Sequence, residues 1–90
     1  MGFFKNLFRR NPAKKYERDK KIAAGKNQDK KRKLASKHQT NPEILFYLAE
    51  SDDVQTRRAV AKNDSTPVQA SKILAADKDE DVRLNLAERL

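Results

Sequence analysis

The hydrophobic and polar positions of residues 41–90 follow nearly the same pattern twice. Pairs of residues return 26 positions later in the chain: Leu48-Ala49 as Leu74-Ala75, Thr56-Arg57 as Val82-Arg83, and Val60-Ala61 as Leu86-Ala87. A fixed period of roughly 20 to 50 residues is typical of stacked repeats, in which each unit buries its apolar face against its neighbours. The pattern predicts an all-α fold, a short α-solenoid of about two and a half helix-turn-helix repeats with a 26-residue period.

Residues 41–65 form the first of two well-defined repeats. Asn41 is a good N-cap for the first helix of this unit, and Pro42 suits the first helical position. Asp53 is a good N-cap for a second helix over residues 54–62. The residues expected to face the core share helical spacing: Ile44, Leu45, Leu48, Ala49, Thr56, Ala59 and Val60.

Residues 66–90 repeat the scheme. Thr66 and Gln69 are spaced as a capping box, in which each side chain bonds the backbone amide of the other, and Asp79 takes the place of Asp53. The residues expected to pack inside are small or apolar: Val68, Ala70, Ile73, Leu74, Ala75, Ala76, Val82, Leu86 and Leu90. Because no capping helix follows in the sequence, the face at Leu86 and Leu90 is predicted to stay open for a homodimer or for further repeats.

Residues 13–40 are interpreted as a degenerate, strongly basic leading repeat. The pattern predicts a helix over residues 12–24, which Gly25 ends, and a second helix over residues 28–37 with Asn27 as its N-cap. Terminal repeats of such arrays are often atypical because one of their sides faces water.

Residues 1–12 form a basic amphipathic arm. If this segment is helical, one side carries the apolar residues and the other the cations: Phe3, Phe4, Leu7 and Phe8 against Lys5, Arg9 and Arg10. One interpretation is an in-plane anchor on an anionic membrane surface. The other is a cap whose phenylalanines fold over the open end of the first repeat. The sequence leaves both interpretations open.

The charge of the chain is unevenly distributed. Residues 1–40 hold 14 Lys or Arg and 3 acids, net +11, whereas residues 41–90 hold 7 and 10, net −3. The densest basic run, Lys30 to Lys33, makes a nucleic-acid-associated protein the alternative function. Such a run is more often a solvated helix face, and the aromatic stacking platforms and base-reading motifs of nucleic-acid binders are missing.

The sequence contains few residues that could carry out catalysis. There is no cysteine and only one histidine, His38, so that a zinc site cannot be built. The acidic residues cluster in turns, where helix capping explains most of them. There is also no glycine-rich phosphate loop and no nucleophile elbow. We therefore expect a protein without enzymatic activity, metal or cofactor.

Two sets of side chains on the repeats are candidates for specific roles. Arg57 and Arg83 each lie four residues after an N-cap aspartate, which predicts a structural ladder in which they bond a neighbouring unit's turn carbonyls or the carboxylates of Asp53 and Asp79. Residues that do not recur are better candidates for binding a protein partner. Those on the outward side of the second helices are Gln55, Arg58, Lys62, Asp81, Asn85 and Glu88.

Several runs in the repeats resemble a known family. They are Asn-Pro-Glu-Ile-Leu-Phe-Tyr-Leu-Ala-Glu at residues 41–50, then residues 57–63, Thr66-Pro67, residues 74–77 and Asp81-Val82-Arg83. This set resembles the bacterial family called domain of unknown function 2336 and, more loosely, HEAT-like repeats and the leucine-rich repeat variant. The resemblance implies a right-handed superhelix of paired helices with an uncharacterised role. Thr56 departs from the family pattern, which has valine before the arginine.

These observations together predict a non-catalytic scaffold or adaptor that binds an unidentified protein partner. Residues 1–8 lack the apolar stretch and cleavage site of a signal peptide, which predicts a cytoplasmic protein. If the arm is an anchor, the protein is peripheral on the inner membrane.

Overall fold

The structure is a computed structural model that describes residues 12–90. Within this range the secondary structure consists of helices without strands, as the sequence predicts. The elements are α2 (Pro12–Ala24), α3 (Gln28–Ser36), α4 (Pro42–Leu48), α5 (Val54–Lys62), α6 (Val68–Ala75) and α7 (Glu80–Arg89). Nearly all of the basic arm lies outside the described residues, so both interpretations of it stay predictions.

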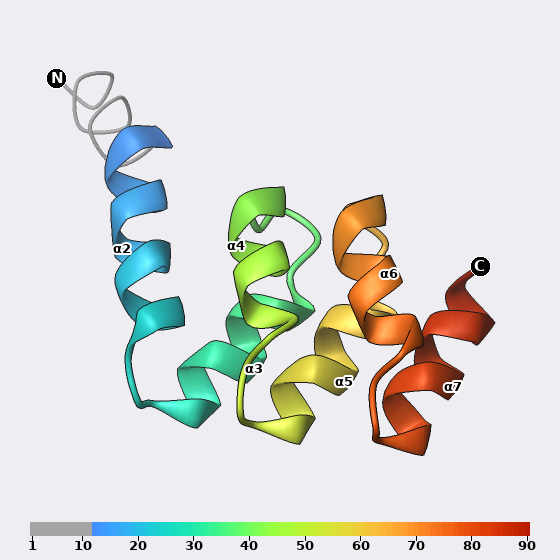
Figure 1. The fold of residues 1–90 in the computed structure, drawn as a ribbon. Coiled ribbons are helices and arrows are strands. Elements are labelled where there is room, and N and C mark those ends of the chain that lie inside the picture. The colour runs from blue at the N-terminus through green and yellow to red at the C-terminus, as the bar shows by residue number, and fades with distance from the viewer. Residues whose placement is uncertain (1–11) are drawn as a thin grey trace, which may run out of the picture.

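The helices lie in two rows (Figure 1). Helices α2, α4 and α6 stand in one row, and α3, α5 and α7 follow each other along the second row. Contacts join α3 to α5 and α5 to α7, so the second row is continuous. This arrangement places one face of each of α3, α5 and α7 on a common surface.

Asparagine and aspartate side chains begin four of the helices at the predicted positions. Asn27 accepts a hydrogen bond from the amide of Lys30 at 3.1 Å. Asn41, Asp53 and Asp79 cap α4, α5 and α7 in the same way. These caps satisfy amide groups that have no partner within the helix, and they fix the point where each helix begins.

The capping box predicted for Thr66 and Gln69 is wrong. Helix α6 begins at Val68, Pro67 is its N-cap, and no side chain caps it. Thr66 is buried, and its hydroxyl donates to the carbonyl of Val60 at 2.7 Å. The hydroxyl therefore bonds the end of the preceding helix, because the turn folds Thr66 back over α5.

We expect Thr66→Val to lower the free energy of unfolding by about 1 kcal/mol, the usual net contribution of one hydrogen bond. Valine keeps the shape of threonine but cannot donate to Val60. Urea unfolding measures the difference. Gln69→Ala is the control, because Gln69 is exposed and α6 has no side-chain cap. If Gln69→Ala were the more destabilising change, the result would support a capping box between Thr66 and Gln69.

A continuous apolar core runs through all six described helices. Its buried members are Ala23, Leu34, Ala35, Ile44, Leu45, Leu48, Ala49, Val60, Ala61, Ala70, Leu74, Val82 and Leu86. The predicted core of residues 41–65 is confirmed, with Thr56 also fully buried and Ala59 partly buried. The apolar stripes at helical spacing thus identified most of the residues that hold the rows together.

The core prediction is wrong at several positions in the last unit. Leu90 is 84% exposed and Val68 is 68% exposed, and Ile73, Ala75 and Ala76 are exposed as well. Leu86 is only 4% exposed, since α7 packs against both α5 and α6. The side chain of Leu86 is therefore not part of the predicted open face, whereas Leu90 is exposed there; the homodimer or further repeats stay a prediction.

Candidate functional site

Two arginine–aspartate pairs join successive helices of the second row. Arg32 of α3 donates from Nε and Nη2 to the two carboxylate oxygens of Asp53, at 2.8 and 2.9 Å. Arg58 of α5 binds Asp79 in the same two-pronged way, with both distances 3.0 Å. Each aspartate is also the N-cap of the helix that follows. One carboxylate therefore both starts a helix and ties it to the preceding helix of the row.

These contacts change the acidity of both carboxyl groups. Hydrogen bonds from Arg32 hold the pKa of Asp53 well below its usual value, and bonds from Thr56 act in the same direction. Hydrogen bonds from Arg58 lower the pKa of Asp79 from 3.8 to about 2. Both groups are therefore ionised at neutral pH, and the charged pairs keep the two arginine side chains in one orientation.

Acid is expected to weaken the fold through the Asp79 pair. A folded pKa of about 2 against an unfolded value of 3.8 means that the unfolded state binds more protons between these values. The stabilisation from this group is complete above pH 3.8 and is lost as the pH falls through 2. Urea unfolding from pH 5 to pH 2 measures it. In Asp79→Asn the slope over this window should be smaller; an unchanged slope would show that the pair is not responsible.

The predicted ladder of Arg57 and Arg83 is correct in that both arginines bond turn carbonyls, but these carbonyls belong to the preceding turn rather than to a neighbouring unit, and the predicted bonds to the carboxylates of Asp53 and Asp79 are wrong. Arg57 donates to the carbonyl of Ser51 at 2.7 Å, within its own unit, and to the carboxylate of Asp77 at 2.8 Å. Arg83 donates to the carbonyl of Asp77. Consecutive helix residues point about 100° apart. Arg57 and Arg58 therefore point in different directions, and Arg58 is the one that binds Asp79, the N-cap of α7.

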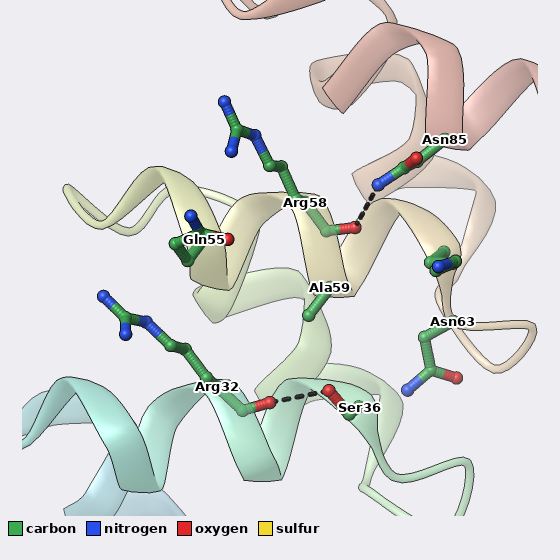
Figure 2. Close-up of a pocket in the computed structure, with 8 residues that line it drawn as sticks. Arg32, Ser36, Gln55, Arg58, Ala59, Asn63 and Asn85 are labelled. Atoms are coloured by element: carbon green, nitrogen blue, oxygen red, sulfur yellow. Dashed lines mark hydrogen bonds between the residues drawn. The ribbon is translucent and has the colours of Figure 1, made fainter. Parts of the chain in front are cut away.

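A groove runs across the second row of helices between these pairs (Figure 2). It has a volume of about 560 Å³. The side chains that line it are mostly polar: Arg32, Ser36, Gln55, Arg58, Ala59, Lys62, Asn63 and Asn85. Figure 2 shows Arg32 and Arg58 extending in the same direction from neighbouring helices, with Gln55 between them. The groove is an open channel lined mainly by polar residues of α3, α5 and α7.

Several polar groups of the groove keep unused hydrogen-bonding capacity. Within residues 12–90, the amide of Gln55 and the ammonium of Lys62 make no hydrogen bond or ion pair. Asn85 donates from Nδ2 to the carbonyl of Arg58 at 3.2 Å, which leaves its Oδ1 free to accept. Arg58 uses Nε and Nη2 for its bonds, and its Nη1 donates to no described residue. The channel thus offers donors and acceptors together with the ammonium of Lys62, which has no partner within residues 12–90.

Asn63 has a different role from its neighbours in the groove. Its Nδ2 donates to the carbonyls of Ala35 and Lys37 at 2.8 and 2.9 Å, and its Oδ1 accepts from the amide of Ser65. The side chain is buried and fully used. Asn63 therefore links the C-terminal ends of α3 and α5 by hydrogen bonds. It lines the groove without offering a free donor to it.

The structure brings together four of the six residues predicted to bind a partner. Gln55, Arg58, Lys62 and Asn85 line the groove. Asp81 lies beside it, with a carboxylate oxygen 3.4 Å from Nη2 of Arg58, whereas Glu88 does not line it. Sequence reasoning missed the contribution of α3, namely Arg32 and Ser36. The spacing contained a signal for the first of these, because Arg32 lies 26 positions before Arg58.

The basic run on α3 does not form a single cationic strip. Lys30 and Lys33 are exposed, Lys31 is half-buried, and Arg32 is paired with Asp53. Four consecutive helix residues point in four directions about 100° apart. A row of phosphates on one face would therefore meet only part of the run, and the nucleic-acid alternative gains no support from this geometry.

The described residues contain no arrangement that would hold a metal ion. Within residues 12–90, no three His, Asp or Glu side chains come together as possible ligands. Across the same range, every helix is too short or too polar to cross a lipid bilayer.

Comparison of the chain with protein-family models, with curated proteins and with solved structures found no match in any of the three. The resemblance to domain of unknown function 2336 therefore stays a prediction.

Proposed function

We propose that this protein is a non-catalytic interaction module whose second row of helices binds an extended segment of a protein partner. The observation that carries the proposal is the groove across α3, α5 and α7, with unpaired polar groups beside two arginines that aspartates hold in place. The proposal also assigns to the chain a short array with a 26-residue period.

Equivalent contacts at this spacing support the array. The hydroxyl of Thr40 donates to the carbonyl of Leu34, as that of Thr66 does to Val60. The pairs Arg32–Asp53 and Arg58–Asp79 correspond in the same register. In such an array, corresponding residues of successive units lie side by side and form a surface suited to an extended chain.

The free groups of the groove fit the chemistry of an extended peptide. Gln55 offers both an N–H and a carbonyl oxygen, Nη1 of Arg58 is a further donor, and Oδ1 of Asn85 is a further acceptor. Backbone amides of a bound segment present the same two kinds of group. The ammonium of Lys62 favours a segment with an acidic side chain at the matching position.

The proposal is tested by selecting binders from a library of displayed linear peptides on the immobilised full chain. We expect the selected peptides to be enriched in Asp or Glu, and Lys62→Glu to weaken their binding about tenfold or more, a cost of about 1.4 kcal/mol. Lys72→Glu is the matched control, because Lys72 is exposed on α6, outside the groove, and the change in net charge is the same. Equal losses in the two variants, or no selected peptide, would contradict the proposal.

Three parts of the sequence-based prediction remain as proposals with this function. They are membership of the bacterial family, a cytoplasmic location, and a role for the basic arm, either as a membrane anchor or as a cap on the first repeat; the arm lies almost wholly outside the described residues. A homodimer also stays a prediction, without Leu86 in its interface.

A further inference from the structure

A small apolar notch lies between α2 and α4, away from the groove. Tyr16 and Tyr47 line it together with Ala23, Ala24 and Ile44. Its volume is about 170 Å³. An apolar cavity of about 150 Å³ holds one benzene molecule. The notch therefore has the size and lining for a single phenyl ring.

One acidic group at the rim of the notch is available to pair with a cation of an occupant. Glu43 lines the notch and accepts a hydrogen bond from the hydroxyl of Tyr16 at 2.8 Å. Its carboxylate has no ion pair within residues 12–90. Among the described residues that line the notch, Lys20 is the one cation, and its ammonium lies over the Tyr16 ring, 5.9 Å from the ring centre. An aromatic segment that also carries cations would complement both the apolar lining and Glu43.

The N-terminal arm of this chain has this chemistry and lies within reach. Phe3, Phe4 and Phe8 precede α2 together with the cations Arg9 and Arg10. Extended chain covers about 13 Å in the four residues from Phe8 to Pro12, and about 30 Å in the nine from Phe3. The helix rise places Tyr16 about 6 Å, and Ala24 about 18 Å, from Pro12 along α2. At least one phenylalanine can therefore reach any part of the notch.

We propose that a phenylalanine of residues 3–8 occupies the notch between Tyr16 and Tyr47, with an arginine of the arm paired to Glu43. The short connection to α2 keeps the arm at high effective concentration near the notch, which favours binding of the ring there. The arm then covers the outer face of the first unit and extends the apolar core beyond Ala23. This inference is independent of the proposed peptide groove.

The test is a set of nuclear Overhauser contacts in the isotopically labelled full chain. We expect contacts from the ring of Phe3, Phe4 or Phe8 to the rings of Tyr16 and Tyr47. Tyrosine is a clean reporter, because the chain has only 2 tyrosines and both line the notch. The triple variant Phe3→Ser, Phe4→Ser, Phe8→Ser should lose these contacts and shift the tyrosine ring signals. Absence of the contacts in the full chain, with the same tyrosine signals in the triple variant, would overturn the proposal.

A second variant fills the notch without changing the arm. Ala24 is exposed and lines the notch, so Ala24→Leu should release the arm and remove its contacts with both tyrosines. Ala75→Leu, at an exposed position of α6, is the matched control and should leave them intact. A mixture of labelled and unlabelled chains separates the two possible sources of the ring. Contacts seen only between chains would overturn the proposal in favour of a second copy as the occupant.

Discussion

Replacing Leu48 by alanine is expected to lower the free energy of unfolding by about 2–5 kcal/mol. The Leu48 side chain is fully buried at the end of α4, in the core that joins both rows of helices. Its removal forfeits the burial of the missing atoms and leaves a cavity that the short helices can close only in part. Urea unfolding followed by circular dichroism measures the loss.

Leu84→Ala is the matched control for this change. Leu84 lies on α7 and is 50% exposed, so its truncation should cost less than about 1 kcal/mol. If Leu48→Ala cost no more than the control, Leu48 would not belong to the core, and the register of α4 would be wrong.

Asp53→Ala is expected to lower the free energy of unfolding by about 2–3 kcal/mol. Loss of an N-cap accounts for about 1 kcal/mol. The remainder comes from the lost charged hydrogen bonds to Arg32, each made at 2.9 Å or less, and from the unpaired hydroxyl of the buried Thr56. The same unfolding measurement checks this value.

Two further variants locate the source of that loss. Asp53→Asn keeps an oxygen for the cap but removes the charge, so it should be intermediate between wild type and Asp53→Ala. Asp64→Ala should have little effect, because this aspartate is exposed and has no hydrogen bond or ion pair in the described part of the chain. An Asp53→Ala variant as stable as Asp64→Ala would show that the link between α3 and α5 contributes nothing.

The positions of the helices could be predicted from local features of the sequence. Proline at position 12, the N-caps and Gly25 fix where helices begin and end, and these signals act within a few residues. The range 12–24 predicted for the first helix agrees with α2 (Pro12–Ala24). Apolar spacing within one helix likewise identified Leu45 and Leu74 as core residues.

Contacts between helices were harder to predict, because one sequence pattern allows several partners. Thr66 has the sequence of a capping box, yet its hydroxyl bonds Val60, six residues earlier. Arg57 and Arg58 are adjacent in sequence, and only the rotation of α5 decides which of them faces Asp79. Leu90 follows the apolar spacing of α7, but it is 84% exposed because it lies at the end of the helix, where its side chain is not covered.

The candidate groove was only partly visible in the sequence for the same reason. The outward positions of α5 were placed correctly on its lining, since they follow from the helix period alone. Ser36 was missed because its role depends on how close α3 lies to α5. The spacing of Arg32, 26 positions before Arg58, was a usable signal that pointed to this neighbour.

The most direct test of the proposed groove is a map of backbone amide shifts when a selected peptide is added to the labelled full chain. Binding along the second row predicts that the largest shifts occur at Ser36, Gln55, Lys62 and Asn85, on three different helices. It also predicts small shifts at Lys72 on α6. Shifts concentrated on α4 and α6, or spread evenly over the surface, would contradict a binding site on α3, α5 and α7.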